Sequence, residues 1–197
     1  RYLAKWRAEL LANSVAEESG AVVLAGPFKG MAYAARASEG ARVTRLIGSY
    51  EAALAPVIEE IIASAPELIV DIGCAEGYYA VGLARRLPGV RVLARDADAR
   101  AQGFCRDMAE ANGVAGQVEV GGLFTHADFA VCAGRRAVIL CDIEGAEEAL
   151  LDPEAAPALR GADILVECHV AEAPGLTDRL AARFAEKVGS LKVGNGA

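Results

Sequence analysis

The segment from Leu68 to Tyr79, LIVDIGCAEGYY, predicts the fold of this chain. Its first five residues are apolar apart from Asp71, as in a strand that is buried on both faces. Gly73 and Gly77 follow, and glycine permits the tight turn that leads from such a strand into a helix. The start of that helix presents unpaired backbone N–H groups. The segment therefore predicts a strand–turn–helix unit with a ligand at the turn.

The chain repeats this unit after Glu67. Short runs rich in Val, Ile and Leu alternate with longer amphipathic segments, which is typical of a parallel sheet with connecting helices. The predicted strands are Leu68–Ile72, Arg91–Arg95, Gln117–Val120, Ala137–Cys141 and Asp163–Glu167. The predicted helices are Tyr79–Leu87, Ala99–Asn112, Ala146–Leu151 and Pro174–Lys187. We expect an α/β fold, Rossmann-like and doubly wound, with a mostly parallel sheet and helices on both faces.

Residues 1–65 have a mostly helical pattern and predict an N-terminal helical extension. One helix comes first, a break follows at Gly26-Pro27, and a second helix is expected over residues 49–64. We expect this region to form a lid or substrate wall. Residues 66–197 would form the Rossmann-like, cofactor-binding domain, and the two regions would make one compact unit.

Composition limits the class of protein. A chain of 197 residues is about one domain, and its net charge of −7 argues against general nucleic-acid binding, which needs a basic face. No apolar run approaches the about 18 residues that span a membrane. The five cysteines are widely spaced and odd in number, as expected of reduced, buried thiols. We therefore expect a cytoplasmic protein without nucleic-acid or membrane partners. The sequence does not indicate its oligomeric state.

Asp71 indicates the chemistry of the ligand at the turn. It lies two residues before a G-x-A-x-G spacing, whereas a dinucleotide site uses G-x-G-x-x-G and receives a pyrophosphate at the helix end. A carboxylate here would repel a pyrophosphate, but it suits a ligand with a cationic amino group, such as S-adenosylmethionine. An ordinary turn without a ligand is the alternative.

Asp96 follows the second predicted strand, about twenty residues past the glycine turn, where Rossmann-like folds place the carboxylate that binds ribose hydroxyls. Asp98 is the competing residue, but it is better placed to cap the following helix. We assign Asp96 to the ribose, with a solvated or capping acid as the alternative.

Further along, Gly121-Gly122 precedes Leu123, and this loop either lies against an adenine ring or is a plain turn.

Residues 68–100 resemble motif I and the following acidic strand of class I S-adenosylmethionine-dependent methyltransferases. The segment AVILCDIEGAE, residues 137–147, resembles the D-x-E-G-A-E element of the FkbM-like branch of that family. The segment ILVECH, residues 164–169, resembles the strand of that branch that ends in E-x-H. Together these elements cover about 100 residues in the family order.

The resemblance implies an enzyme that methylates a hydroxyl group of a small molecule and releases S-adenosylhomocysteine. By position it implies a methionine site of Asp71, Gly73, Ala75 and Gly77, with Asp96 on the ribose, Leu123 near the adenine and Asp142 facing the methyl group. Ala75 replaces the central glycine of the motif, which the family tolerates. The family's sheet also ends in an antiparallel strand pair, whereas residues 190–197 provide about one short strand.

Two strand ends supply candidate catalytic groups. His169 is the candidate general base, because its ordinary pKa near 6.5 suits proton transfer, and Asp142 is the acid that would hold it. A less favoured alternative is a divalent cation bound by Asp142, His169 and either Glu144 or Glu167. In a third reading these groups only connect the strand ends or bind the cofactor's amino group.

Three further residues have weaker assignments. His126, the other histidine, is expected to be a surface loop residue. Tyr50 and Glu51 are candidates to contact the cofactor or the acceptor, with helix capping and packing as the alternative. Two other functions stay open for the chain, an NAD(P)-dependent oxidoreductase and a non-catalytic protein that binds the cofactor. The missing third glycine and Asp71 argue against the oxidoreductase.

Overall fold

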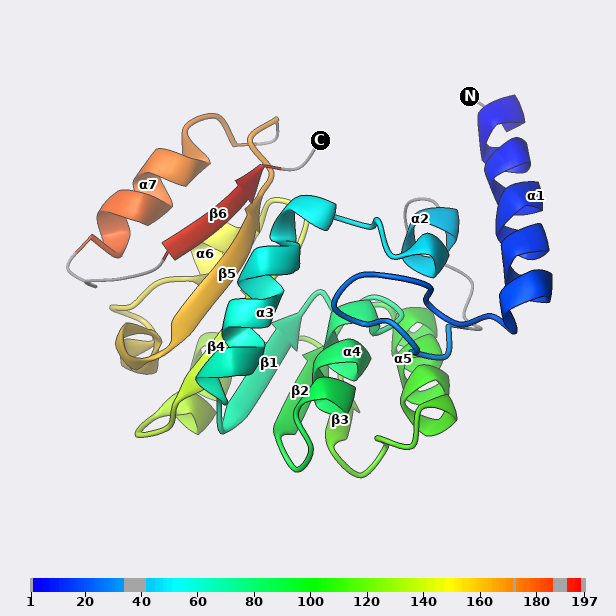
Figure 1. Cartoon of the computed structure of the whole chain (residues 1–197). Helices are drawn as coiled ribbons and strands as arrows, with labels where there is room; N and C mark the ends of the chain where they lie inside the picture. The colour runs from blue at the N-terminus through cyan, green and yellow to red at the C-terminus, as the bar shows by residue number, and fades with distance from the viewer. Residues whose placement is uncertain (1, 34–41, 172, 186–190, 196–197) are drawn as a thin grey trace.

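The computed structural model describes residues 2–33, 42–171, 173–185 and 191–195. Their centre is one sheet of six parallel strands in the order β3-β2-β1-β4-β5-β6 (Figure 1). The strands are β1 (Leu68–Ile72), β2 (Arg91–Arg95), β3 (Val118–Gly121), β4 (Ala137–Cys141), β5 (Asp163–Cys168) and β6 (Leu191–Asn195). The predicted α/β, Rossmann-like fold is confirmed.

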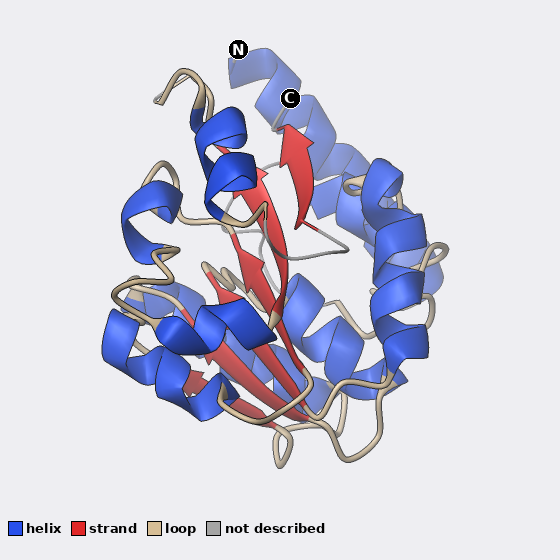
Figure 2. Ribbon diagram, turned by 90° about the vertical axis from the view of Figure 1, so that its left-hand side faces the viewer, coloured by secondary structure: helices blue, strands red, loops and turns tan. Residues whose placement is uncertain are grey.

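Helices cover both faces of this sheet (Figure 2). One face carries α3 (Ala55–Ser64), α4 (Tyr78–Arg86) and α5 (Ala99–Ala111). The opposite face carries η2 (His126–Cys132), α6 (Glu147–Leu150), η3 (Pro157–Gly161) and α7 (Leu176–Arg183). The N-terminal region adds α1 (Tyr2–Ser19), α2 (Arg42–Ile47) and η1 (Ala52–Leu54). The sheet is therefore doubly wound, as expected.

Two hydrophobic cores lie on the two faces, because successive side chains of a strand point in opposite directions. Ile69 of β1 belongs to the core under α3, α4 and α5, which also includes Phe28 and Leu46 of the N-terminal region. Leu68 and Val70 belong to the core under α6 and α7. All five residues of β1 are buried, which explains their nearly continuous apolar run.

The helix expected over residues 49–64 is wrong in its first part. Glu51 has a left-handed backbone with φ of 44°, which interrupts any helix that starts at Ser49. A short 3-10 turn follows, and α3 begins at Ala55 with Pro56 in its first turn, where proline is tolerated. The break predicted at Gly26 is confirmed, because its φ is +74°.

The end of the sheet also differs from what the resemblance implies. The last described strand, β6, pairs parallel to β5 rather than forming part of an antiparallel pair. The chain that links the two strands includes α7, and a helical crossover of this kind returns a strand in the parallel direction. The expected helix ended at Lys187, which lies outside the described residues, and α7 ends at Arg183.

Two predictions from composition have direct counterparts in the fold. Among the described helices, none combines the length and the apolar character needed to cross a membrane. The five cysteines are free and buried, as predicted for thiols that pack as small apolar side chains: Cys74, Cys105, Cys132, Cys141 and Cys168.

Candidate functional site

A cavity of about 630 Å³ opens at the carboxyl ends of the central strands. Its walls come from the loops after β1, β2, β3 and β4, from the end of β5, and from the segment before α3. The strand order reverses between β1 and β4, and open α/β sheets bind ligands at such a reversal. The cavity is therefore the candidate ligand site.

The two glycines of the β1–α4 turn allow close packing of the loop. Gly73 has φ of +83°, and a Cβ atom there would lie 1.6 Å from the carbonyl oxygen of Asp142. Gly77 has φ of +90°, and its Cβ would lie 2.7 Å from Sγ of Cys105 in α5. Gly73 and Ala75 line the cavity, whereas Gly77 does not. Gly77 therefore allows the turn to pack closely on α5 and does not itself contact a ligand in the cavity.

Asp71 is a buried acid at the cavity wall, with only 5% of its surface exposed. The backbone N–H of Ala80 donates to its carboxylate, but Oδ2 has no hydrogen-bond partner among the described residues. Burial raises the pKa of Asp71 to about 7, and the charge of Asp96 adds to the effect. A buried carboxylate oxygen without a partner is costly, and a cationic ligand would remove that cost.

Asp96 is fixed at the cavity by two backbone donors. The N–H of Ala75 donates to Oδ2 at 2.9 Å, and the N–H of Asp98 donates to Oδ1 at 2.8 Å. A carboxylate has about four acceptor positions, so both oxygens can accept further hydrogen bonds. Asp98 accepts a bond from the N–H of Arg100 at 2.9 Å and caps α5, which confirms its predicted role.

A buried polar network beneath the glycine turn was not predicted. Glu76 has no exposed surface, accepts a hydrogen bond of 2.6 Å from the hydroxyl of Tyr33, and lies 2.9 Å from Nε of Arg45. The guanidinium of Arg45 also lies 3.8 Å from the centre of the Tyr50 ring, a cation–π contact. Through these contacts, Tyr33 and Arg45 of the N-terminal region bind Glu76 of the turn. A charged residue between the turn glycines is a local signal for Glu76, but no local pattern indicates its partners.

Aromatic side chains extend this contact. Edge-to-face pairs join Tyr78 to Phe28, Tyr33, Tyr50 and Tyr79, with ring centroids 5.3 to 6.0 Å apart. The hydroxyl of Tyr79 donates to Glu51. Tyr50 and Glu51 both line the cavity, so the segment before α3 forms part of its wall.

The ends of β4 and β5 bring His169 into a group of carboxylates. Nδ1 of His169 lies 2.8 Å from Oε1 of Glu147, a fully buried residue that also accepts from the N–H groups of Ile143 and Gly145. Nε2 of His169 lies 3.3 Å from Oε2 of Glu144 and 3.5 Å from Oδ1 of Asp142. The fold thus brings the predicted pair, Asp142 and His169, together.

Asp142, Glu144 and Glu167 line the cavity, whereas the largely buried His169 lies behind them. Burial and the charge of Glu167 raise the pKa of Asp142 to about 7. Burial also raises the pKa of Glu167. For His169, burial lowers the pKa, but the hydrogen bond and charge of Glu147 outweigh it and the pKa is raised overall. A base in direct contact with the cavity is therefore a carboxylate rather than the imidazole.

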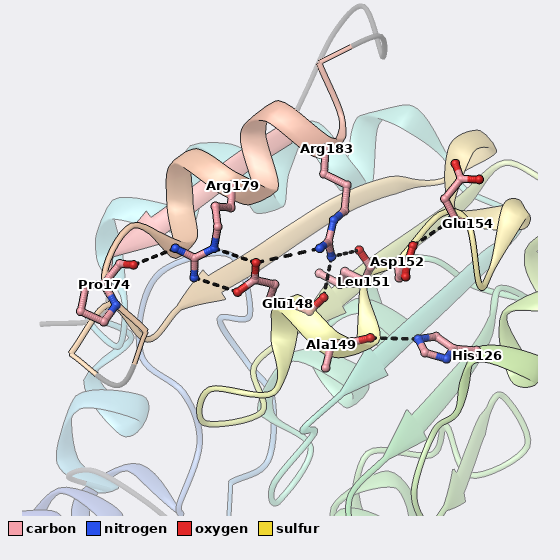
Figure 3. Close-up of polar contacts among 9 residues, drawn as sticks. All are labelled: His126, Glu148, Ala149, Leu151, Asp152, Glu154, Pro174, Arg179 and Arg183. Atoms are coloured by element: carbon pink, nitrogen blue, oxygen red, sulfur yellow. Dashed lines mark hydrogen bonds and ion pairs between the residues drawn. The ribbon is translucent and has the colours of Figure 1, made fainter.

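Helix α6, which carries Glu147, is fixed from outside by α7 (Figure 3). Arg179 donates two hydrogen bonds of 2.7 Å to Glu148, and Arg183 donates one of 2.9 Å to the carbonyl of Leu151. His126 is partly exposed, as predicted for a surface residue, but it does not lie in a plain loop. This residue begins η2, lines the cavity, and lies with Nε2 2.9 Å from the carbonyl of Ala149.

No protein-family model matches this sequence, and no curated protein matches it. Among solved structures, cofactor-bound Rv0187 from MTB is similar at 21% identity and a TM-score of 0.51, covering 68% of each chain. The O-methyltransferase from Bacillus cereus in complex with SAH is similar at 18% identity and a TM-score of 0.51, covering 70% of this chain and 68% of that one. At these identities the likeness shows the fold alone, which this chain shares with both proteins.

Proposed function

We propose that this chain is an S-adenosylmethionine-dependent methyltransferase that acts on a hydroxyl group of a small molecule. The observation that carries the proposal is Asp71, whose buried Oδ2 at the cavity wall has no hydrogen-bond partner among the described residues. Such a carboxylate disfavours a pyrophosphate and suits the amino group of the cofactor. The similar fold of the Bacillus cereus O-methyltransferase with SAH bound supports the same cofactor.

We assign residues at the cavity to three parts of the cofactor: the methionine part, the ribose and the adenine. Asp71, Gly73 and Ala75 contact the methionine part, and Gly77 holds the turn that presents them. Asp96 accepts hydrogen bonds from the ribose hydroxyls. Leu123, with 78% of its surface exposed at the cavity, lies against the adenine.

Asp142 and His169 are the proposed catalytic pair. Asp142 lines the cavity at the end of β4, next to the cofactor turn, where the methyl group would arrive. His169 lies behind it, with Nε2 3.5 Å from Oδ1 of Asp142, so the imidazole lies next to the carboxylate that would take the proton of the acceptor hydroxyl. The acceptor oxygen must be held in line with the methyl–sulfur bond, and such placement supplies much of the rate of a displacement.

The remaining assignments complete the proposal. Residues 1–65 provide a substrate wall, which Tyr50, Glu51 and Arg45 at the cavity support. We assign the chain to the FkbM-like branch because its D-x-E-G-A-E and E-x-H elements resemble those of that branch. The protein works in the cytoplasm without a nucleic-acid or membrane partner.

Calorimetric titration with S-adenosylhomocysteine, NAD and NADP in parallel tests the cofactor class. We expect binding of S-adenosylhomocysteine alone. Binding of NAD or NADP in its place would overturn the proposal, and binding of none of the three would leave no catalytic cofactor site.

The oxidoreductase alternative keeps one observation in its favour, because the six-strand parallel order is also that of dinucleotide-binding folds.

The affinity for S-adenosylhomocysteine is expected to rise with pH. Because burial raises the pKa of Asp71 to about 7, this acid is largely protonated at pH 6 and must lose a proton to pair with the amino group. The dissociation constant should fall by up to about tenfold per pH unit below pH 7 and level off above it. Titrations between pH 5.5 and 8.5 measure this slope, and Asp71→Asn should remove it.

The same acid affects folding in the opposite direction. Its neutral form is favoured in the folded state, so its contribution to stability is complete below pH 4 and is lost as pH rises through about 7. Asp71→Asn should therefore become more stable relative to the native protein over that range, as urea unfolding at pH 4.5 and 8 would measure. A constant difference between the two proteins would contradict the assignment.

A further inference from the structure

The wall of the cavity is largely acidic, whereas the methionine part of S-adenosylmethionine carries a carboxylate as well as an amino group. Carboxylates that line the cavity belong to Glu51, Asp71, Asp142, Glu144 and Glu167. Like charges that are brought together in a partly buried site repel each other strongly, so these side chains disfavour a ligand carboxylate. A ligand that has one therefore needs a cationic side chain on the same wall.

Among the described residues, the lysine and arginine side chains at the cavity are those of Arg45 and Arg95. Arg95 ends β2 directly before Asp96, the residue assigned to the ribose, and its guanidinium lies 2.6 Å from Glu119. Arg45 instead contacts the turn assigned to the methionine part, because its Nε lies 2.9 Å from Oε1 of Glu76. Arg45 is therefore the arginine that is placed for a carboxylate of the methionine part.

The N-terminal region holds the guanidinium of Arg45 in a fixed position. Only 3% of this residue is exposed, and its Cζ atom lies 3.8 Å from the centre of the Tyr50 ring. The helix that carries it, α2, is fixed as well, because the fully buried Leu46 accepts a hydrogen bond of 2.8 Å from the N–H of Leu24. A charge that is already ordered and shielded from water binds an opposite charge more strongly than a mobile, hydrated one.

The ion pair with Glu76 is compatible with a second carboxylate on the same arginine. A guanidinium has five N–H donors in a fixed planar arrangement, so two carboxylates can bind to different edges of it. Glu76 also accepts a hydrogen bond of 2.6 Å from the hydroxyl of Tyr33, so Arg45 is not its only donor.

We propose that Arg45 binds the carboxylate of the cofactor's methionine part while it keeps its ion pair with Glu76. This assignment rests on the proposed cofactor. Asp71 would pair with the amino group and Arg45 with the carboxylate, so the site would take adenosyl amino acids and discriminate against adenosyl amines, which lack the carboxylate. The N-terminal region would then determine the choice of cofactor as well as forming a substrate wall.

Calorimetric titration of the full chain at pH 8 with two ligands tests this role. The ligands are S-adenosylhomocysteine and its analogue with hydrogen in place of the carboxylate. The native protein should bind the analogue about 10- to 100-fold more weakly, as expected for the loss of charge-assisted hydrogen bonds. Arg45→Met should bind both ligands with affinities within about threefold of each other, because neither ligand then has a charged partner for that group. A merely loosened turn would weaken both ligands and keep the difference between them.

Two further variants support this comparison. Arg95→Met is the matched control, because Arg95 lines the same cavity beside the ribose position, and it should keep the native difference between the ligands. Arg45→Met combined with Glu76→Gln leaves no buried charge of the pair behind, so it should fold even where the single change does not. This double variant should also bind the two ligands nearly equally.

Equal binding of the two ligands by the native protein would overturn the assignment of Arg45. So would a variant without this arginine that keeps the native difference. A native protein that does not bind S-adenosylhomocysteine at all would overturn the proposed cofactor, and the assignment of Arg45 with it. Binding of S-adenosylhomocysteine without discrimination would overturn the carboxylate contact alone, so the two failures are distinct.

Discussion

Replacing Asp96 with alanine is expected to weaken the binding of S-adenosylhomocysteine about 100-fold. The ribose hydroxyls would lose a charged acceptor, and hydrogen bonds to charged groups contribute about 1.5–3 kcal/mol each. The N–H of Ala75 would also lose its partner, so the turn that contacts the methionine part would be less well fixed. Calorimetric titration at pH 8, where Asp71 is ionised, measures the change.

Asp98→Ala is the matched control for this experiment. Asp98 lies two residues away and caps α5, but it does not line the cavity. Its loss should cost about 1 kcal/mol of stability and leave the affinity within twofold of the native value. If the two variants weakened binding equally, the ribose assignment of Asp96 would be wrong.

Replacing Arg45 with methionine is expected to lower the free energy of unfolding by about 3–5 kcal/mol. The change leaves the buried Glu76 carboxylate without its guanidinium, and breaking a buried ion pair from one side has a cost of this size. Methionine keeps much of the volume of the arginine side chain, so the loss reports on charge more than on packing. Urea unfolding at pH 7 measures it.

Two further variants separate charge from other effects. Arg45→Met combined with Glu76→Gln should recover part of the loss, because the glutamine is neutral and still accepts the hydrogen bond from Tyr33. Arg160→Ala breaks an exposed ion pair with Glu154 and should cost less than about 1 kcal/mol. A cost at Arg45 as small as that at Arg160 would show that the buried pair is not needed for folding.

The central strands could be predicted from sequence because burial on both faces leaves a strong composition signal. The predicted bounds of β1, β2 and β4 agree with the structure to the residue. The start of α3 could not be predicted, because the residues from Ser49 onward favour a helix and only the left-handed backbone of Glu51 prevents it. The direction of β6 likewise depends on how α7 crosses the sheet rather than on the composition of the strand.

Site residues at strand ends could be predicted for a related reason. In a parallel sheet the carboxyl ends of neighbouring strands share one edge, so Asp71, Asp96 and Asp142 had to meet there. The contacts of the N-terminal region could not be predicted in this way, because that region contributes no strand to the sheet. Tyr33 and Glu76 are 43 residues apart, and no periodicity or spacing relates them. The position of His126 at the cavity could not be predicted, because it depends on the contact between its ring and the Ala149 carbonyl of α6.

The contact between Gly73 and the Asp142 carbonyl has a consequence for the redesign of this protein. The loop that would hold the cofactor and the loop that would face the acceptor touch backbone to backbone, without space for even a methyl group. Neither loop can be exchanged for that of another protein without moving the other. Tyr50 and Glu51 border the same cavity from a segment outside the sheet. Changes of acceptor preference are therefore best introduced in that segment, where sequence variation leaves the shared backbone intact.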